Sequence, residues 1–456
     1  MSSSLMIRNF INNIMDPGES LKWRTAQGFI VVLFGAAYQN VTRLIGNLIM
    51  TRLLFPEAFG LMLIVNLVIY AISMLSEAGI RAAVIVHDKG QDREFIDTAW
   101  TLLVIRGALL CLITCALAYP ISEAYDEPIL FPMILAVSLS ALIRGFSSPN
   151  EFLYDRDVKK VRIIILEAMA QTGSLIFTIT WLWFYPSIWA LVGMGIFASS
   201  VYAVFSYVLF EGQRPSLYFD RKTAFEIIHF GKWILFSSAL TFLGSQGDKL
   251  IVSNWISTAE LGLFSIAIGL AKIPEALSGT LCWKLLLPVY SELRIKNTGQ
   301  LSKQVMKVEL LLFLVCAPFI FGMTLFGVQL IDFMYDDRYL GAGWMLQILA
   351  LGTIFTAFNE TQIALMIAHT HSFRSTVFQA SRVALLLLSL GIGGALYGFV
   401  GLVYAISIAP ALFYVILVIF NMPYYKTSPL VQISGIILLL LVVGIGWNTI
   451  GWPGFS

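Results

Sequence analysis

Charged residues are scarce in this chain. Only 12% of its 456 residues are charged, whereas 58% are hydrophobic and the mean hydropathy is +0.82. Soluble domains carry about 25% charged residues, so this chain cannot cover a water-facing surface in the usual way. The composition predicts a polytopic membrane protein, and the formal net charge of +2 gives no reason to expect a nucleic-acid partner.

The signatures of metal, redox and nucleotide chemistry are also lacking. No GxxxxGK[ST] motif occurs, so this chain is not expected to hydrolyse ATP. The few cysteines lie in apolar runs without CxxC spacing or a nearby histidine, which indicates buried thiols. We therefore expect no cofactor and no metal site. The four cysteines are Cys111, Cys115, Cys282 and Cys316.

Long apolar runs are what the sequence has in abundance. A helix needs about 20 apolar residues to cross the hydrocarbon core of a bilayer. The polar segment 1–27 holds no short apolar core before a small-residue cleavage site, so no signal peptide is expected. Spans are predicted at 28–53, 59–83, 98–119, 129–146, 163–184, 188–210, 231–255, 262–288, 308–331, 343–368, 375–396 and 400–420, with a thirteenth at 431–448.

The positions of the positive charges predict the orientation of these spans. With a cytoplasmic N-terminus, 21 of the 29 Lys and Arg residues fall on the inner side, and only Arg52 and Arg338 fall outside. Inner loops carry the excess of Lys and Arg in membrane proteins. The remaining six basic residues lie within spans. The outer connections are all about ten residues or shorter, so no outer catalytic domain is possible and the chain is not expected to be an enzyme.

An internal repeat predicts how the spans are grouped. Residues 46–62 align without a gap with residues 248–264, and Gly60 falls on Gly262. The two copies begin at spans one and seven, so six spans separate them and both halves have the same orientation. Parallel repeats of this kind form transporters with the substrate site between the halves. We expect two six-helix lobes, 28–222 and 223–420, around a central cavity, with 421–456 as an extra C-terminal transmembrane helix.

Several motifs carry a family resemblance. The run "TRLLFPEAFGLM" followed by "SEAGIRAAVI", Phe230-Gly231, Gln246-Gly247-Asp248, "LGLFSIA" from Leu261 and "PVYSEL" from Pro288 occur in the order typical of the family. The chain resembles the polysaccharide transporters, the Wzx-like oligosaccharide flippases of the multidrug/oligosaccharidyl-lipid/polysaccharide exporter superfamily. Gln246 stands where that family usually has asparagine.

Charged and polar residues inside the spans are the candidate site. A charge near the bilayer centre costs roughly 2.5–3.5 kcal/mol on insertion scales, so it must face water or a partner. Basic residues converging on a cavity favour an anionic ligand, because a guanidinium binds phosphate bidentately. The predicted substrate-binding residues are Arg43, Lys249, Lys272, Arg382, Asn40 and Asn47. The predicted titratable coupling groups are Glu360, Asp248 and Glu77.

Five of these residues have a structural alternative that the sequence leaves open. Arg43 could belong to a buried structural pair, and Lys249 could extend outward to the membrane surface. Lys272 could pair internally with Glu275, across a proline that allows a kink. In the same way, Glu77 could pair with Arg81, and Glu360 could hydrogen-bond a neighbouring helix.

The resemblance implies a function. It implies a flippase of the bacterial cytoplasmic (inner) membrane that carries undecaprenyl-diphosphate-linked oligosaccharide from the inner to the outer leaflet by alternating access, for O-antigen or exopolysaccharide synthesis. Its partners would be the lipid-linked substrate, membrane lipids, a polysaccharide polymerase and glycosyltransferases. The first alternative is an ion-coupled multidrug antiporter of the same superfamily, with a cavity dominated by carboxylates. A membrane glycan polymerase or ligase is disfavoured, because all four histidines lie in or beside inner loops.

Overall fold

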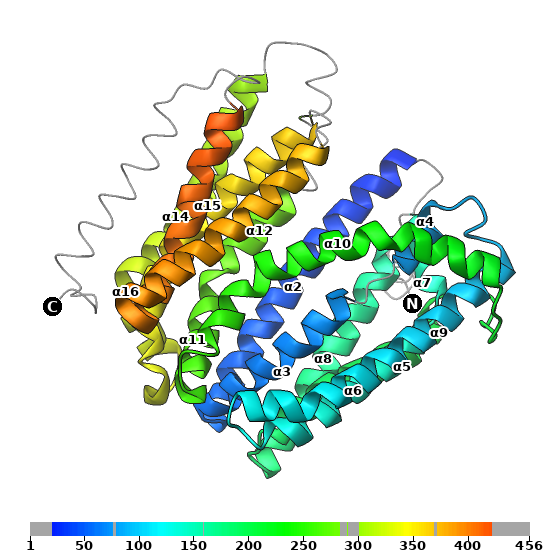
Figure 1. Ribbon diagram of the computed structural model, residues 1–456, viewed down its shortest axis with the longest axis horizontal. Coiled ribbons are helices and arrows are strands. Elements are labelled where there is room, and N and C mark those ends of the chain that lie inside the picture. Colours follow the sequence, from blue (N-terminus) through cyan, green and yellow to red (C-terminus); the bar gives the residue numbers. More distant parts are fainter. Residues whose placement is uncertain are drawn as a thin grey trace, which may run out of the picture. The chain divides into compact units, whose positions relative to one another are not determined.

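The protein is built from helices. The computed structural model describes residues 21–75, 79–157, 159–282, 290, 301–368 and 372–421, and these contain no strand (Figure 1). The helices are α2 (Leu21–Leu53), α3 (Pro56–Leu75), α4 (Ile80–Val86), α5 (Arg93–Ala124), α6 (Leu130–Gly145), α7 (Asn150–Arg156), α8 (Lys160–Phe184), α9 (Trp189–Leu209), α10 (Arg221–Val252), α11 (Thr258–Ala271), α12 (Ile273–Leu281), α14 (Leu301–Met334), the 3-10 turn η2 (Asp337–Tyr339), α15 (Ala342–Ala368) and α16 (Ser372–Asn421).

These helices confirm an all-α polytopic membrane protein. Within the described ranges, seven helices are long and apolar enough to cross a membrane, or eight if the pair α6 and α7, bent by 66°, forms one span. Each of the twelve expected spans contains helix among its described residues, whereas the expected thirteenth, 431–448, lies outside the described residues. The helices often extend beyond the predicted spans, because backbone hydrogen bonding continues where hydropathy has already fallen. Thus α5 begins at Arg93 and α10 at Arg221.

Four of the expected spans are interrupted or joined in the structure. The second span ends at Leu75 in α3, and α4 begins only after Gly79, which has a left-handed φ of 63°. The eighth span is divided at Lys272 into α11 and α12. The eleventh and twelfth spans are continuous in α16 except at Tyr397 and Gly398, where Gly398 adopts a φ of 57° that glycine tolerates without steric cost.

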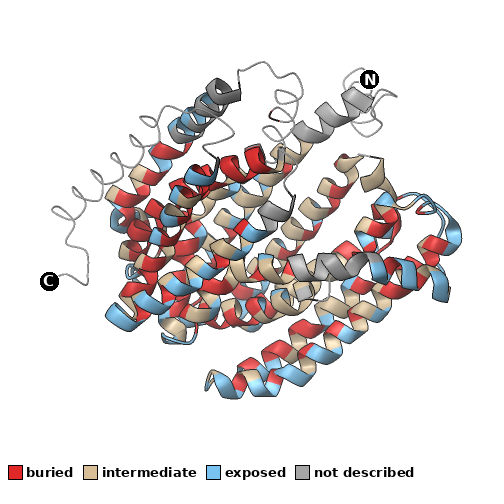
Figure 2. Cartoon of the chain, turned by 45° about the horizontal axis from the view of Figure 1, so that its top comes forward, coloured by how far each residue is buried: buried red, intermediate tan, exposed pale blue. Residues whose placement is uncertain are grey.

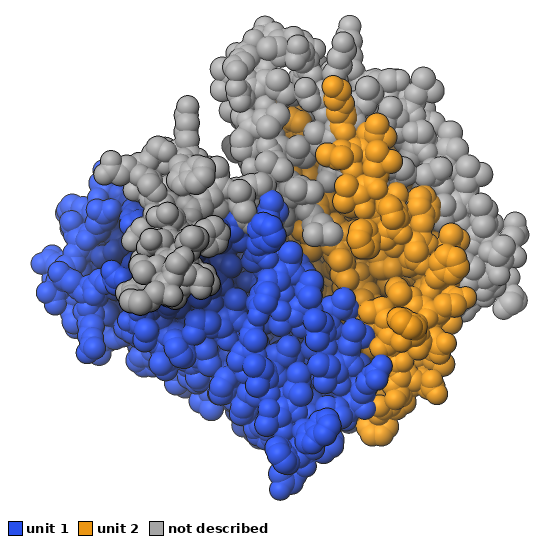
Figure 3. Space-filling model, turned by 180° about the vertical axis from the view of Figure 1, so that it is seen from behind, with its two compact units in different colours: residues 1–54, 64–239 blue, residues 55–63, 240–456 orange. Residues whose placement is uncertain are grey.

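The chain divides into two compact units, coloured separately in Figure 3. Unit 1 comprises residues 1–54 and 64–239, and unit 2 comprises residues 55–63 and 240–456. The first turns of α3 therefore belong to unit 2, although the rest of α3 belongs to unit 1. The expected division into two lobes related by the internal repeat, 28–222 and 223–420, remains a prediction.

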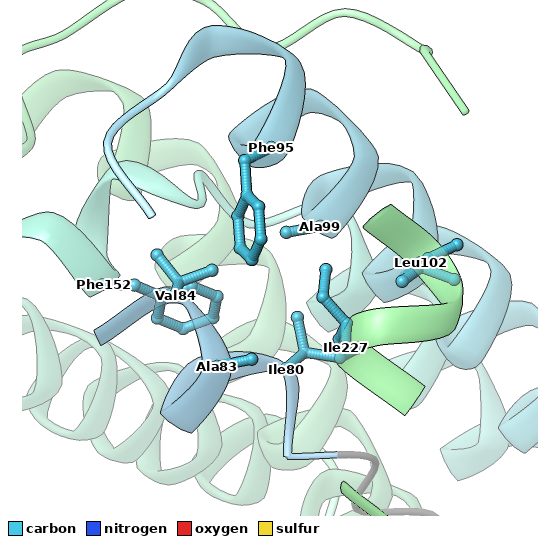
Figure 4. Packing of buried hydrophobic residues seen from close by; sticks show 9 residues of the cluster. Ile80, Ala83, Val84, Phe95, Ala99, Leu102, Phe152 and Ile227 are labelled. Atoms are coloured by element: carbon cyan, nitrogen blue, oxygen red, sulfur yellow. The ribbon is translucent and has the colours of Figure 1, made fainter. Parts of the chain in front are cut away.

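Unit 1 contains a packed cluster where four helices meet. Ile80, Ala83 and Val84 of α4 pack against side chains of α5, α7 and α10. Figure 4 shows the ring of Phe95 among them.

Asp220 precedes α10 and accepts a hydrogen bond from the backbone N–H of Thr223 at 2.7 Å. Hydrogen bonding from Thr223 lowers the pKa of the Asp220 carboxyl, because these bonds favour its charged form.

Unit 2 is organised around α15. Almost every residue of this helix is buried, and buried residues are red in Figure 2. The helix packs against α11, α12, α14 and α16. A helix that is apolar on all sides belongs in the middle of a bundle. However, α15 also buries polar side chains, including Gln347, Asn359 and Gln362. This central helix therefore brings polar groups into the interior of unit 2.

Two glycines let the first turns of α3 and α11 meet backbone to backbone. A methyl group on Gly60 would overlap the carbonyl oxygen of Thr258, and one on Gly262 would overlap the carbonyl oxygen of Pro56. These contacts are reciprocal, because the offset of 202 pairs Gly60 with Gly262 and Pro56 with Thr258. The segment 55–63 also contacts the α14–α15 connection, where the Arg338 guanidinium lies 4.6 Å from the Phe55 ring centre. Both sets of contacts hold 55–63 within unit 2.

We predict that Gly60→Ala and Gly262→Ala each destabilise the protein. The added methyl group must displace backbone, and such overpacking costs about 1–3 kcal/mol. The apparent midpoint of thermal unfolding of the purified protein should fall for both variants.

Gly269→Ala is the matched control, since Gly269 lies in α11 and a methyl group there meets nothing within 4 Å. Alanine is favoured over glycine inside a helix, so this variant should unfold at the same or a higher temperature. Unchanged midpoints for Gly60→Ala and Gly262→Ala would contradict the close crossing.

Candidate functional site

A pocket inside unit 2 collects most of the charged residues expected in spans seven to eleven. It is formed by α10, the junction of α11 and α12, α15 and α16. Its charged lining residues are Asp248, Lys272, Glu275 and Arg382. Two acids and two bases thus balance one another in this lining. The positively charged central cavity expected between the halves stays a prediction, and this pocket within unit 2 has a lining of mixed charge.

Lys272 pairs with Asp248. Its Nζ atom lies 3.6 Å from Oδ2 of Asp248, whose side chain is only 6% exposed, whereas the Lys272 side chain is 36% exposed. Lys272 stands between α11 and α12, and Pro274 occupies the first turn of α12. The predicted break at the proline therefore occurs, and it places the ammonium group opposite α10. A buried carboxylate needs such a partner, because an isolated charge in an apolar interior is costly.

A second acid–base pair joins α15 and α16. Nη1 of Arg382 lies 3.9 Å from Oε1 of Glu360, with the two side chains 27% and 15% exposed. Beside Glu360, the amide of Asn359 donates to the carbonyl oxygen of Pro410 on α16 at 3.0 Å. Polar residues at the middle of α15 thus hold these two helices together. The ion pair between Glu360 and Arg382 was not expected from the sequence.

Lys249 has a different environment from its neighbour Asp248. Its Nζ atom donates to Oε1 of Gln246 at 2.6 Å, one turn back on α10, and its side chain is half-buried. Gln246 is the residue that departs from the pattern of the resembled family. Its amide oxygen accepts from the lysine, so it has a clear structural role in this chain.

The polar stripe on α2 is held together by its own side chains. Nη2 of Arg43 donates to Oδ1 of Asn40 at 3.0 Å, and Nδ2 of Asn40 donates to the carbonyl oxygen of Ala36. Arg43 is exposed, and none of the described acids lies within ion-pair distance of it. Asn47 lies further along the helix and is half-buried. Arg43 is thus a positive charge that keeps its capacity for an anion.

Polar side chains of α8 form an interface with α2. Gln39 of α2 donates to Glu167 of α8 at 2.9 Å, and Gln171 of α8 returns a bond to the carbonyl oxygen of Gln39 at 2.8 Å. Gly35 and Gly46 face α8 as well, since a methyl group on either would overlap a side chain there. Gln39 was not singled out in the sequence. Its position four residues before Arg43, on the same face of the helix, could have indicated that it belongs with these polar residues.

Glu77 lies outside the described residues. Its pairing with Arg81 therefore stays a prediction, and Arg81 makes ion pairs with two acids of α7. The Nη2 atom of Arg81 is 2.6 Å from Asp155, and its Nη1 atom is 3.5 Å from Glu151. The spacing of four residues within one helix therefore did not reveal these partners of Arg81, which lie some 70 positions away in the sequence.

The fold is that of a class of solved helical transporters. A solved multidrug resistance MATE family transporter of the MOP superfamily, in an inward-facing conformation, matches with a TM-score of 0.67, covering 89% of this chain and 96% of that chain at 12% identity. The lipid II flippase MurJ, in an inward closed conformation, matches with a TM-score of 0.67, covering 90% of this chain and 91% of that chain at 14% identity. Both are transport proteins rather than enzymes.

The family follows from the sequence. The model of the family described as polysaccharide biosynthesis protein matches residues 49–344, and the chain belongs to this family. The lipopolysaccharide biosynthesis protein WzxC of Escherichia coli K12 is 21% identical over 382 residues, which are 83% of this chain and 75% of that protein. The resemblance read from the motifs is confirmed.

The Lys272–Asp248 pair leads to a prediction about stability. Asp248→Asn and Lys272→Gln should each destabilise the protein, because each leaves the partner charge in a poorly hydrated pocket. The double variant should lose less than the sum of the two, by a coupling of about 1–2 kcal/mol. Apparent unfolding midpoints of the purified variants measure this coupling.

The control is a second double-mutant cycle, in which Glu275→Gln takes the place of Asp248→Asn. Glu275 is the partner suggested by sequence spacing, but its carboxylate is not the one found within 4 Å of Lys272. Its coupling with Lys272 should be the weaker of the two. A stronger coupling to Glu275 would show that the lysine pairs along its own helix.

Proposed function

We propose that the protein is a flippase that moves an oligosaccharide linked to undecaprenyl diphosphate from the inner to the outer leaflet of the bacterial cytoplasmic membrane. Membership of the polysaccharide biosynthesis family carries this proposal. The fold likeness to the lipid II flippase MurJ supports it, because that protein is named for moving a lipid-linked cargo. Oligosaccharide transfer by a single helical chain without a nucleotide-binding motif fits alternating access.

The physical problem that such a protein solves is desolvation. A headgroup with several sugars and two phosphates loses many hydrogen bonds to water when it enters hydrocarbon. Polar and charged side chains within the helices offer replacements for those bonds. In this proposal Arg43, Lys249, Lys272 and Arg382 contact the anionic part of the cargo, and Asn40 and Asn47 contact sugars or phosphate.

Coupling to an ion gradient or to the membrane potential is assigned to the carboxylates. Asp248 and Glu360 each hold a basic residue of the proposed cargo site, at 3.6 Å and 3.9 Å. Protonation of either acid would release its lysine or arginine for the cargo. Glu77 is kept as a third coupling candidate. The proposal also includes a cytoplasmic N-terminus, a polymerase that consumes the flipped product and glycosyltransferases that supply the substrate.

A multidrug antiporter is the second candidate, and one observation favours it. The unit 2 pocket carries as many acids as bases in its lining, which suits a cationic ligand better than a purely basic cavity would. The MATE family likeness is of fold alone, at 12% identity. The polysaccharide biosynthesis family makes the flippase the stronger proposal.

Arg43→Ala and Lys272→Ala should each reduce surface polysaccharide by about tenfold or more, since each removes a charge-assisted hydrogen bond to the cargo. Lipid-linked oligosaccharide should then accumulate in the inner leaflet. The measurement is made in a deletion strain that carries each variant, with protein amounts in the membrane fraction compared. Arg52→Ala is the control, because Arg52 is an exposed arginine at the end of the same helix as Arg43.

Normal polysaccharide with both variants would refute the site assignment. Normal polysaccharide in the deletion strain itself, together with loss of efflux of a cationic dye, would favour the antiporter.

A further inference from the structure

Unit 1 contains a second pocket that the proposed cargo residues do not enter. It is lined by the end of α3, by α4, α5 and α6, by the connection from α6 to α7, and by α9, and its volume is about 460 Å³. This is within the usual range of ligand pockets and far larger than a site for one water molecule. Its charged and hydroxyl-bearing lining includes Ser73, Arg81, Arg106, Arg144, Ser147 and Glu151. Three arginines therefore face one acid among the described lining residues.

A glycine crossing places two of these arginines side by side on neighbouring helices. Gly107 of α5 and Gly145 of α6 meet so closely that a methyl group on Gly107 would lie 3.1 Å from the Cα atom of Gly145. Each glycine directly follows an arginine, Arg106 in α5 and Arg144 in α6. Arg106 is anchored by a hydrogen bond from its Nη2 atom to the carbonyl oxygen of Ser73 at 2.9 Å.

Arg144 is positioned without a side-chain hydrogen bond to any other described residue. Its Cζ atom lies 3.1 Å from the centre of the Tyr202 ring, so the guanidinium stacks on that ring. Among the described residues, no acid forms an ion pair with Arg144. Stacking fixes the plane of a guanidinium and leaves its N–H groups pointing outward in that plane, which is the arrangement that binds phosphate bidentately.

Ser147 supplies an independent sign that something binds here. It lies one turn beyond Arg144, is 8% exposed, and its Oγ atom is buried without a hydrogen-bond partner. It lines the same pocket. A buried hydroxyl without a partner is unfavourable. A bound group that accepts a hydrogen bond from it would remove that cost.

We propose that this pocket binds the phosphate group of a lipid headgroup, with Arg144 and Ser147 as its donors. Arg81 is already neutralised by Glu151 and Asp155, so its role is to hold the wall of the pocket. The predicted topology places Arg144 and Arg81 at the inner ends of their spans, level with the headgroups of the inner leaflet. The phosphate comes either from a membrane phospholipid or from the diphosphate of the cargo. Only the second source rests on the proposed function.

Binding to the purified full-length protein in detergent tests the proposal by native mass spectrometry. The probes are phosphatidylglycerol, undecaprenyl diphosphate and, as a lipid without phosphate, diacylglycerol. Arg144→Gln should weaken binding of a phosphate-bearing lipid about tenfold, because it removes a charge-assisted bidentate contact. Arg214→Gln makes the same change of charge at an exposed loop residue outside the pocket and should leave binding unchanged.

Ser147→Ala separates binding from folding. Its hydroxyl has no hydrogen-bond partner among the described residues, so the thermal midpoint without lipid should stay the same or rise. Binding of the phosphate-bearing lipid should still weaken, by about threefold, through loss of one hydrogen bond.

The lipid affected identifies the source of the phosphate. An Arg144→Gln loss confined to phosphatidylglycerol supports a membrane-lipid site, a loss confined to undecaprenyl diphosphate supports a cargo site, and a loss of both supports a phosphate site open to either. Unchanged binding of both lipids by Arg144→Gln and Ser147→Ala would overturn the proposal and leave Ser147 to a water molecule. The export assay on Arg43 and Lys272 judges the proposed function separately.

Discussion

The need to neutralise or hydrate charge inside an apolar helical bundle governs this structure. A lysine or carboxylate removed from water persists only beside an opposite charge, a hydrogen-bonding group or a wet cavity. Asp248, the least exposed of the paired acids in unit 2, lies against Lys272, and Glu360 lies against Arg382. Each pair joins helices that follow one another along the chain, α10 with the α11–α12 junction and α15 with α16. The charges that prepare unit 2 for a polar ligand also bind its helices to one another.

This pairing gives the proposed cargo site a means of control. A basic residue held by a carboxylate is not available to a phosphate until that carboxylate is protonated or displaced. Arg43 differs, because its one described side-chain contact is the neutral Asn40. Within the described residues, Arg43 of unit 1 thus forms no ion pair, whereas Lys272 and Arg382 of unit 2 each lie beside an acid.

Close helix crossings are the second structural device, and glycine makes them possible. Gly60 and Gly262 allow backbones to touch in unit 2, and Gly107 and Gly145 do so in unit 1. Association of helices within lipid relies on close packing, because the tails of the lipid are as apolar as the side chains. The first crossing joins residues related by the internal repeat. The second sets the positions of two arginines on one pocket wall.

Much of the fold could be predicted from sequence because apolar runs report membrane spans directly. The twelve spans in the described part of the chain, the break near Pro274 and the repeat of Gly60 in Gly262 were all readable in this way. The breaks at Gly79 and at Gly398 were not, because backbone torsion at one glycine leaves no mark on hydropathy. The pairing of Lys272 was also beyond reach, since spacing along one helix suggested Glu275, whereas the carboxylate found within ion-pair distance lies on α10. Spacing did not indicate the α7 partners of Arg81 either, and its pairing with Glu77 stays a prediction.

The sequence by itself determined that this is a many-spanned helical membrane protein, that its halves repeat, and that charges lie within its spans. The cost of placing polar groups in lipid is local, so it can be read residue by residue. The tertiary structure alone decided which acid faces which base, that the unit 2 pocket is balanced in charge, and that Arg144 and Ser147 share a pocket in unit 1. Those properties depend on the rotation and crossing of helices, which arise from contacts between segments far apart in the chain.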